Sequence, residues 1–519
     1  MSKHDAFRSM VLEGYSFKGE HFPLGAAVLD GAVSTGTIVN LPLRTMNRHG
    51  LIAGATGTGK TKTLQLLAEG LSAASVPVLM MDIKGDMSGL AAAGQPGPRI
   101  QERMDNIGAA DWQPMACPVE LLTLSDAPGV RLRSTVLEFG PILMSRILGL
   151  NETQEGVMSM VFKYCDDERM PLLDLRDLVR VLQHVGGDGR KELEALYGRI
   201  SPSTTGTILR KVVELQQQGG DGFFGEPSFD VEDLMRMAPD GRGVVSILRV
   251  TEMQDRPKLF STFMLGLLAE LYANLPEEGD LDTPKLLMFI DEAHLIFQEA
   301  TPALLQQLET VIKLIRSKGV GIFFCTQNPQ DIPAPILSQL GLKIQHALRA
   351  FTAADRKGIK LAAENYPETE YYQVDELLTG LGIGEALVTL LNEKGIPTPL
   401  VHTMLLPPRS RMGVLTDVEI STLVNQSKLV SKYAQARDSE SALEILNARM
   451  EEAERRLKES EAAEEADEPA SKGRAPKEKS IFDDPIVRQA GKTAATILTR
   501  SLLGALGLGG GRRKGRGLF

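Results

Sequence analysis

The chain has 519 residues, of which 43% are hydrophobic and 24% charged, and a formal net charge of −10, which is ordinary for a soluble globular protein of two or three domains. The negative charge argues against a surface that is basic throughout, but it permits a local basic patch or a basic ring interior. Three distant cysteines, no apolar N-terminal segment of signal-peptide length and no run of about 20 apolar residues predict a cytoplasmic protein without disulfides or an integral membrane segment.

The first pattern with chemical meaning lies in residues 50–63, GLIAGATGTGKTKT. From Gly54 to Thr61 it fits G-x-x-x-x-G-K-[ST], the loop in which glycines turn the backbone so that N–H groups surround phosphates. The Lys60 ammonium would reach the β and γ phosphates of ATP, and the Thr61 hydroxyl would ligate Mg²⁺. The predicted nucleotide-binding residues are Gly54, Ala55, Thr56, Gly57, Thr58, Gly59, Lys60, Thr61 and Lys62.

The segments around this loop supply the context that the motif requires. Residues 51–53 are expected to form a short buried strand and residues 61–74 a helix, whose positive dipole end would face the same phosphates. A second apolar run at 78–81 completes a β-α-β unit, which predicts a parallel sheet with helices on both faces. With the elements in this order, a chance glycine turn is the weaker interpretation.

The second strand leads into three charged residues, Asp82, Lys84 and Asp86. Ligands of parallel sheets collect at the carboxyl ends of the strands, so we expect these side chains near the nucleotide. For each residue alone, a plain polar turn is as good an interpretation as a catalytic role.

Residues 140–240 interrupt the alternation of strands and helices. Apolar residues recur at three- and four-residue spacing within 140–168, 171–185, 191–200 and 206–220, a pattern typical of amphipathic helices. The sequence therefore predicts a helical insertion. A lid or subunit-contact role and a purely structural role are both open for it.

A pair of acidic residues follows a later buried strand. Residues 286–290 form a continuous apolar run, which suits a central parallel strand, and Asp291 and Glu292 come directly after it. Asp291 is placed to hold Mg²⁺ through a water, and Glu292 to orient or deprotonate the water that attacks ATP. Capping of the next helix is a weaker interpretation. For His294, a packed or solvated histidine is as good an interpretation as a coupling role.

Two further segments contain catalytic candidates. The next buried strand ends before Gln327, whose amide would sense the γ-phosphate or fix the attacking water, with turn capping equally open. A fifth strand, expected within 342–359, presents Arg349 and Arg356, and Arg316 precedes Gly319 on a helix. One of these arginines would act on a neighbour's ATP, as arginine fingers do. For any single arginine a surface ion pair is more common.

The composition changes beyond Pro408. Residues 438–468 are rich in Glu and Ala, and their apolar positions follow a 3,4 spacing for two heptads, which is too short for a firm coiled-coil prediction. Residues 461–480 are predicted as a charged linker, and 481–519 as an amphipathic segment with a basic glycine-rich tail. The tail could contact nucleic acid or anionic lipid, although a solvated disordered tail is the more common outcome.

Several of these motifs carry a family resemblance: GATGTGKT, the strand ending DIKGD, FIDEAH, RSKGVGIFFCTQNPQDIPAPILSQ and LRAFTAAD. Over residues 20–405 the chain resembles the HerA-like P-loop ATPases of the HerA/FtsK superfamily, and the YjgR-type bacterial proteins are the most similar group. The resemblance implies a RecA-like core, ATP hydrolysis, hexameric rings and, in characterised members, DNA translocation. Lys60 and Thr61 match the Walker A pair of the family. Asp291 and Glu292 match its Walker B pair.

The resemblance also extends to Gln327, which matches the glutamine after the family's fourth strand, and to Arg349, which matches the arginine of its leucine-arginine strand and is therefore our finger candidate. Two regions differ from the family pattern. The small N-terminal barrel of HerA is shortened to residues 1–47, and the region from about residue 410 has no counterpart. Because of both differences, DNA pumping with a nuclease partner of the HerA type is not carried over.

The letters DEAH at 291–294 are also those of one class of RNA helicase, which has two tandem RecA-like lobes and a late glutamine-arginine-glycine motif. This chain has one phosphate-loop core, and about 230 residues separate Lys60 from Asp291. The letters are therefore interpreted as a Walker B strand that happens to be followed by Ala293 and His294.

We predict an α/β fold: a RecA-like P-loop NTPase core with a mainly parallel sheet, a helical insertion and a partly disordered helical C-terminal tail. The predicted function is that of an ATP-hydrolysing ring motor that uses ATP and Mg²⁺, a homo-oligomer, suspected to be a hexamer, with DNA and an unidentified protein as candidate partners. The alternative is a regulatory or scaffold protein with little turnover, against which intact Lys60 and Glu292 argue. A metabolic kinase would need an acceptor pocket that the sequence does not reveal.

The predicted divisions are 1–47 (strand-rich segment), 48–139 and 241–408 (two parts of the ATPase core), 140–240 (helical insertion), 409–460 (C-terminal helices), 461–480 (linker) and 481–519 (amphipathic segment with basic tail).

Overall fold

The structure is a computed structural model, and it describes residues 2–109, 112–252, 256–279, 281–298, 300, 302–437 and 439–466. The chain groups into two compact units. The first contains Met1–Leu132 and Phe229–Gln435, and the second contains Arg133–Ser228 and Ala436–Phe519. Most of the predicted linker and the whole amphipathic segment at 481–519 lie outside the described residues.

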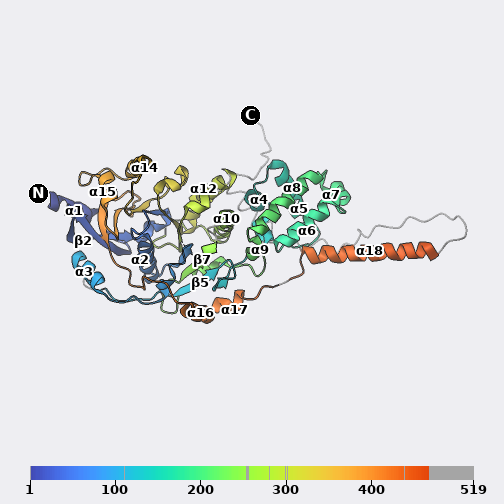
Figure 1. The fold of residues 1–519 in the computed structure, drawn as a ribbon, viewed down its shortest axis with the longest axis horizontal. Coiled ribbons are helices and arrows are strands. Elements are labelled where there is room, and N and C mark those ends of the chain that lie inside the picture. The colour runs from blue at the N-terminus through green and yellow to red at the C-terminus, as the bar shows by residue number, and fades with distance from the viewer. Residues whose placement is uncertain are drawn as a thin grey trace, which may run out of the picture. The chain divides into compact units, whose positions relative to one another are not determined.

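One mixed sheet organises the first unit (Figure 1). Its strands are β1 His21–Leu29, β2 Ala32–Pro42, β3 Gly50–Ala53, β4 Val78–Asp82, β5 Val119–Thr123, β6 Val130–Arg131, β7 Val245–Arg249, β8 Leu286–Ile290, β9 Val320–Thr326, β10 Leu342–Gln345, β11 Glu385–Thr389 and β12 Val401–Leu405. Their spatial order is β2-β1-β12-β11-β10-β3-β9-β8-β4-β7-β5-β6. Neighbours from β10 to β6 are parallel, and those from β2 to β10 are antiparallel. The sheet is mainly parallel, as predicted.

Continuous apolar runs explain the centre of this sheet. Every residue of β3, β4, β8 and β9 is buried, as expected of parallel strands that are covered on both faces. Helix α2 (Lys60–Ala73) packs on β1 and β4, and α12 (Pro302–Ile315) packs on β9. Because these central strands run in the same direction, the segments that follow them meet at one edge of the sheet.

Helix α1 (Lys3–Gly14) was not predicted. Ser2 and Asp5 form its capping box, a start signal that is present in the sequence. The following strands β1 and β2 extend the central sheet through the pairing of β1 with β12. The remaining helices of the first unit are α3 Pro98–Ile107, α10 Pro257–Asn274, α11 His294–Phe297, α13 Ala334–Leu337, α14 Ala353–Ala363, α15 Val374–Gly380, α16 Asp417–Gln426 and α17 Lys428–Tyr433.

The strand expected within 342–359 is much shorter than predicted. It ends at Gln345, and α14 begins at Ala353, because Thr352 and Asp355 form a capping box that starts a helix. Strand β10 also lies inside the sheet, between β11 and β3. The expectation that a strand within 342–359 presents Arg349 is therefore wrong, and Arg349 lies in the loop after β10.

The second unit is helical. It contains α4 Val136–Ile147, α5 Glu152–Asp167, α6 Leu175–Gly186, α7 Arg190–Tyr197, α8 Pro202–Gln217, α9 Gly220–Phe223 and α18 Ala442–Ala466. Helix α6 packs against α8 and α18, with the buried apolar face Leu175, Leu178, Val181, Leu182 and Val185. Among the described residues of both units, no helix is long and apolar enough to cross a membrane.

A buried carboxylate connects α18 to α6. Asp177 accepts a hydrogen bond of 3.0 Å from the backbone N–H of Leu443 and another from the Ser441 hydroxyl. Ala442 and Leu446 are buried, whereas residues 451–456 are exposed. The apolar positions at the start of α18 are therefore used within this unit.

Candidate active site

The phosphate loop connects the end of β3 to the start of α2. Gly57 and Gly59 adopt left-handed φ values of 79° and 115°, which an L-side chain would disfavour. The backbone N–H of Gly54 donates to Thr326 O at 3.2 Å, and that of Ala55 donates to Ala347 O at 2.8 Å. The loop is therefore tied to the ends of β9 and β10, its neighbours in the sheet.

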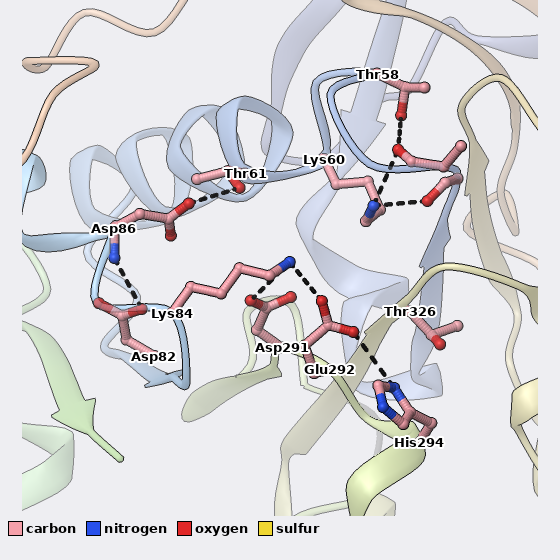
Figure 2. Close-up of polar contacts among 12 residues, drawn as sticks. Thr58, Lys60, Thr61, Asp82, Lys84, Asp86, Asp291, Glu292, His294 and Thr326 are labelled. Atoms are coloured by element: carbon pink, nitrogen blue, oxygen red, sulfur yellow. Dashed lines mark hydrogen bonds and ion pairs between the residues drawn. The ribbon is translucent and has the colours of Figure 1, made fainter. Parts of the chain in front are cut away.

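Lys60 is folded back onto its own loop (Figure 2). Its Nζ donates to the carbonyl oxygens of Gly54 at 2.6 Å and Ala55 at 3.2 Å, and the Thr58 hydroxyl donates to Ala55 O at 2.7 Å. Only 6% of Lys60 is exposed, and burial lowers the pKa of its ammonium. These bonds hold the loop in a compact shape with the lysine at its centre.

The acid pair lies at the same edge of the sheet, directly after β8. Asp291 and Glu292 are 3% and 6% exposed. Glu292 has a left-handed φ of 46°, a strained backbone conformation for a glutamate and typical of functional sites. Its Oε2 lies 3.3 Å from Nδ1 of His294, but accepts no hydrogen bond. Burial raises the pKa of Asp291.

Lys84 is the cation beside this pair. Its Nζ forms an ion pair with Glu292 Oε1 and lies 3.8 Å from Asp291 Oδ2, as Figure 2 shows. Burial acts to lower the pKa of Lys84, but the two carboxylates outweigh it, so that the pKa is raised. The ammonium therefore stays charged between the acids.

Asp82, at the end of β4, fixes the loop that carries Lys84. Its carboxylate accepts backbone hydrogen bonds from Gly85 at 2.7 Å, Asp86 at 3.1 Å and Met87 at 3.0 Å. Burial raises the pKa of Asp82 to about 6. Asp86, on the same loop, accepts a hydrogen bond of 3.1 Å from the Thr61 hydroxyl.

Comparison with known proteins places this chain in a family. The family model described as helicase HerA-like C-terminal matches residues 29–514. The chain belongs to this family. The sequence-based resemblance to HerA-like P-loop ATPases is thereby confirmed, and the chain is a P-loop ATPase of this family. The assignment to the YjgR-type group stays a prediction.

Two curated relatives are similar to this HerA-like chain. Both are described as DNA double-strand break repair helicase HerA. The protein of Sulfolobus acidocaldarius is 21% identical over 378 residues, which are 71% of this chain and 67% of the relative. The protein of Sulfurisphaera tokodaii is 20% identical over 372 residues, with the same coverage of both chains.

The fold of the HerA-like chain is shared with a solved structure. The unbound form of the bacterial conjugative coupling protein TrwB, without its first 70 residues, gives a TM-score of 0.50 at 15% identity, covering 79% of this chain and 94% of that truncated chain. A structure of TrwB in complex with ADP and Mg²⁺ gives a TM-score of 0.49 at 16% identity, covering 76% and 97%. The first match supports the RecA-like P-loop fold.

The donor set of the HerA-like site suits Mg²⁺. Three carboxylate oxygens of this site are buried without a hydrogen-bond partner: Asp86 Oδ1, Asp291 Oδ2 and Glu292 Oε2. Within the described part of the chain, no three His, Cys, Asp or Glu side chains converge as a metal cluster. Mg²⁺ usually takes one or two carboxylates plus substrate phosphates rather than a closed protein cage, so the open set of hard oxygen donors fits this ion.

His346, a buried histidine that was not predicted from the sequence, contacts the helix that follows the phosphate loop. Nδ1 of His346 lies 2.9 Å from Glu385 O and must donate to it, so Nε2 accepts from the Thr63 hydroxyl at 2.9 Å. Burial lowers the pKa of His346 to about 4. Its position directly after a buried strand is the signal that could have identified it, as it did for Asp82 and Asp291.

The turn at 382–385 touches the same loop. The Gly384 N–H donates to Thr58 O at 3.0 Å. Arg103 of α3 fastens this turn by donating to Ile383 O at 2.7 Å and Gly384 O at 2.9 Å. The sequence offered no signal for Arg103, because 281 residues separate it from Gly384.

The remaining predicted residues lie at different places in the HerA-like core. Gln327 is exposed directly after β9, at the edge that carries the loop. Arg349 is exposed and donates to Thr379 O at 3.4 Å, and Arg356 is exposed on α14. Arg316 lines a cavity of about 470 Å³ together with Arg48 and others. These two arginines precede β9 and β3, so the cavity is at the opposite, amino edge of the sheet.

Proposed function

We propose that this HerA-like ATPase is a homo-oligomeric motor that uses ATP and Mg²⁺ to move along or separate DNA. One observation carries the proposal: this chain brings the phosphate-loop lysine and the buried acid pair to the same edge of the parallel part of one sheet. The relatives described as DNA repair helicases support DNA as the polymer. With a net charge of −10, DNA contact would be confined to local basic surface.

The residues have separable roles in hydrolysis. Lys60 would exchange the carbonyls of Gly54 and Ala55 for the β and γ phosphates, because phosphate oxygens carry more negative charge. Glu292 would take the proton of the attacking water as the water oxygen bonds to the γ-phosphorus. The bond from that phosphorus to the β–γ bridging oxygen breaks, and ADP and phosphate leave. Mg²⁺, held by Thr61 and Asp291, would offset the phosphate charge.

Two further residues have proposed roles at the γ-phosphate. Gln327 lies exposed at the end of β9, where its amide would orient the attacking water. Arg349 would reach the nucleotide of a neighbouring subunit, in head-to-tail contacts that close into a ring. Exposure of Arg349 in a loop supports a contact with a second chain.

The test is the rate of phosphate release with Mg²⁺ and ATP, with and without duplex DNA. Ionic strength is held constant, because DNA binding is strongly salt-dependent. We expect hydrolysis that duplex DNA stimulates and that Lys60→Ala abolishes. A rate of phosphate release that is the same with and without duplex DNA at low salt would reject DNA as the polymer. No hydrolysis beyond the Lys60→Ala level under any condition would favour the regulatory or scaffold alternative.

A further inference from the structure

The ammonium of Lys84 occupies the position between two carboxylates at which a cation is expected. It forms an ion pair with Glu292 Oε1 and lies 3.8 Å from Asp291 Oδ2, and Figure 2 shows the side chain extended between the two acids. The acids are almost completely buried, with side chains 5% and 8% exposed, whereas the Lys84 side chain is 34% exposed. The lysine is therefore the more accessible and more easily displaced partner.

The position of Lys84 is fixed by hydrogen bonds within its own turn. Three backbone N–H groups donate to the buried carboxylate of Asp82, and they belong to the residues that follow Lys84. Strand β4, which ends at Asp82, pairs in parallel with β8, which ends before Asp291. A fixed turn on one strand thus projects an ammonium over the acid pair of the next strand.

The charge of Lys84 affects whether a divalent cation can bind at the acid pair. Two carboxylates carry two negative charges, and Lys84 cancels one of them. A divalent cation at Asp291 would be repelled by an ammonium only a few ångströms away and would find one net negative charge instead of two. Asp291 Oδ2 is buried without a hydrogen-bond partner, so it is free to accept a ligand once the ammonium moves.

We propose that Lys84 is a positioning residue that keeps free divalent metal off the acid pair until nucleotide arrives. The proposal rests on the proposed ATPase function and names the order of binding at that site. The triphosphate brings negative charge, which draws Lys84 away from Glu292 and allows metal to enter together with nucleotide. Without nucleotide, Lys84 neutralises the buried acids.

The experiment is titration of the full-length protein with Mn²⁺ in the absence of nucleotide, with free Mn²⁺ followed by electron paramagnetic resonance. Wild type should bind Mn²⁺ weakly. Lys84→Met should bind one Mn²⁺ per chain at least about tenfold more tightly, equivalent to about 1.4 kcal/mol. Lys84→Arg, which keeps the charge, should resemble wild type. Adding Asp291→Asn to Lys84→Met should remove the gained site.

Lys285→Met is the matched control, because Lys285 pairs with Glu278 just before β8, at the far end of the strand that leads to the acid pair. It should leave Mn²⁺ binding at the wild-type level. Equal Mn²⁺ affinity of wild type and folded Lys84→Met would overturn the proposal, as would an equal gain in Lys84→Arg. If Lys84→Met does not fold, Lys84→Gln replaces it with the same expectation.

The result is independent of turnover. A chain that hydrolyses no ATP but gains a Mn²⁺ site in Lys84→Met would reject the proposed function and support the binding-site part of this inference. A chain that hydrolyses ATP normally and gains no site would retain the function and reject the role of Lys84. Nucleotide should also raise the Mn²⁺ affinity of wild type more than that of Lys84→Met.

Discussion

The two ends of strand β3 each have a buried neutral histidine, but they differ in what surrounds it. At the amino end, His49 Nε2 donates to Ile312 O at 2.8 Å, and Nδ1 accepts from the Ile322 N–H at 3.0 Å. At the carboxyl end, both nitrogens of His346 are also bonded. Burial lowers the pKa of each to about 4. The histidines are thus equivalent supports for two different edges of the sheet.

The difference lies in the neighbouring groups. Backbone strain occurs at both ends, since His49 and Glu292 both have positive φ. At the amino end both ring nitrogens of the strained residue, His49, are hydrogen-bonded. At the carboxyl end Glu292 and Asp291 each keep a buried oxygen without a hydrogen-bond partner, 3.3 Å from His294 and 3.8 Å from Lys84, respectively. Strain beside carboxylate oxygens that lack hydrogen bonds marks an edge shaped for a ligand, whereas strain at a residue whose ring nitrogens are both bonded marks a structural joint.

The largest expected effect is the loss of ATP turnover in a variant of Arg349, the finger candidate at the carboxyl edge of the sheet. Arg349→Ala should leave ATP binding nearly intact and reduce turnover by roughly 10³-fold or more, because a finger stabilises only the transition state. Mixing it with Lys60→Ala should restore some activity, since a mixed interface pairs an intact loop with an intact arginine. Phosphate release from single and mixed variants measures both.

Two outcomes would change this picture. If Arg316→Ala at the amino edge, or Arg356→Ala on α14, behaves in this way and Arg349→Ala does not, the ring stands and the choice of residue is wrong. If sedimentation shows a fully active monomer at assay concentration, both the ring and the finger fail.

The next effect concerns the acid pair. Glu292→Gln should lower kcat by roughly 10²- to 10⁴-fold, the range for loss of a general base, while ATP still binds. Glu278→Gln makes the same change on a residue that pairs with Lys285, at the other end of β8, and should have the wild-type rate. Equal rates for Glu292→Gln and wild type would remove Glu292 from the mechanism.

The two histidines predict a shared dependence of stability on pH. Each has a folded-state pKa of about 4, below the ordinary 6.5. The contribution of each neutral histidine to the free energy of unfolding is therefore complete above pH 6.5 and is lost as pH falls toward 4. In this range the histidine binds a proton in the unfolded chain but stays neutral in the folded chain. The difference between the pKa of the folded and the unfolded state corresponds to about 3 kcal/mol of stability for each histidine.

His346→Gln and His49→Gln should therefore each flatten the fall in the free energy of unfolding between pH 6.5 and 4, as measured by urea denaturation. Only His346→Gln should also weaken ATP binding, because His346 contacts the loop helix through Thr63. An unchanged pH dependence in both variants would show that neither histidine is buried and neutral. Weaker ATP binding in His49→Gln would remove the distinction between the edges.

The smallest effect compares one substitution at both ends of β3. A Cβ at Gly50 would lie 2.4 Å from the Phe323 ring, and a Cβ at Gly54 would lie 2.5 Å from His346 Cβ, at a φ of 156°. Gly50→Ala and Gly54→Ala should each destabilise by about 1–3 kcal/mol, as overpacking does. Thermal unfolding measures both, and ATP affinity should fall only for Gly54→Ala. A larger loss of affinity in Gly50→Ala would contradict the assignment of the edges.

The sequence alone determined the chemical parts of the site and the parallel centre of the fold. The phosphate loop, the acid pair and their strands are local patterns, because a glycine-rich turn and a buried apolar run depend on neighbouring residues. The same reasoning fails for 342–359, where the prediction of one strand conflicts with the helix that Thr352 and Asp355 start. That signal was local and was overlooked.

Other features were decided only by the tertiary structure. The ion pair of Lys84 with Glu292 joins residues 208 positions apart (292 − 84), and His346 reaches Thr63 across 283 positions. The position of Arg349 away from a sheet edge depends on β11 and β12 covering that side of β10. Such contacts follow from strand order and from the packing of distant segments, and no local residue pattern encodes the partner that a buried charge meets after folding.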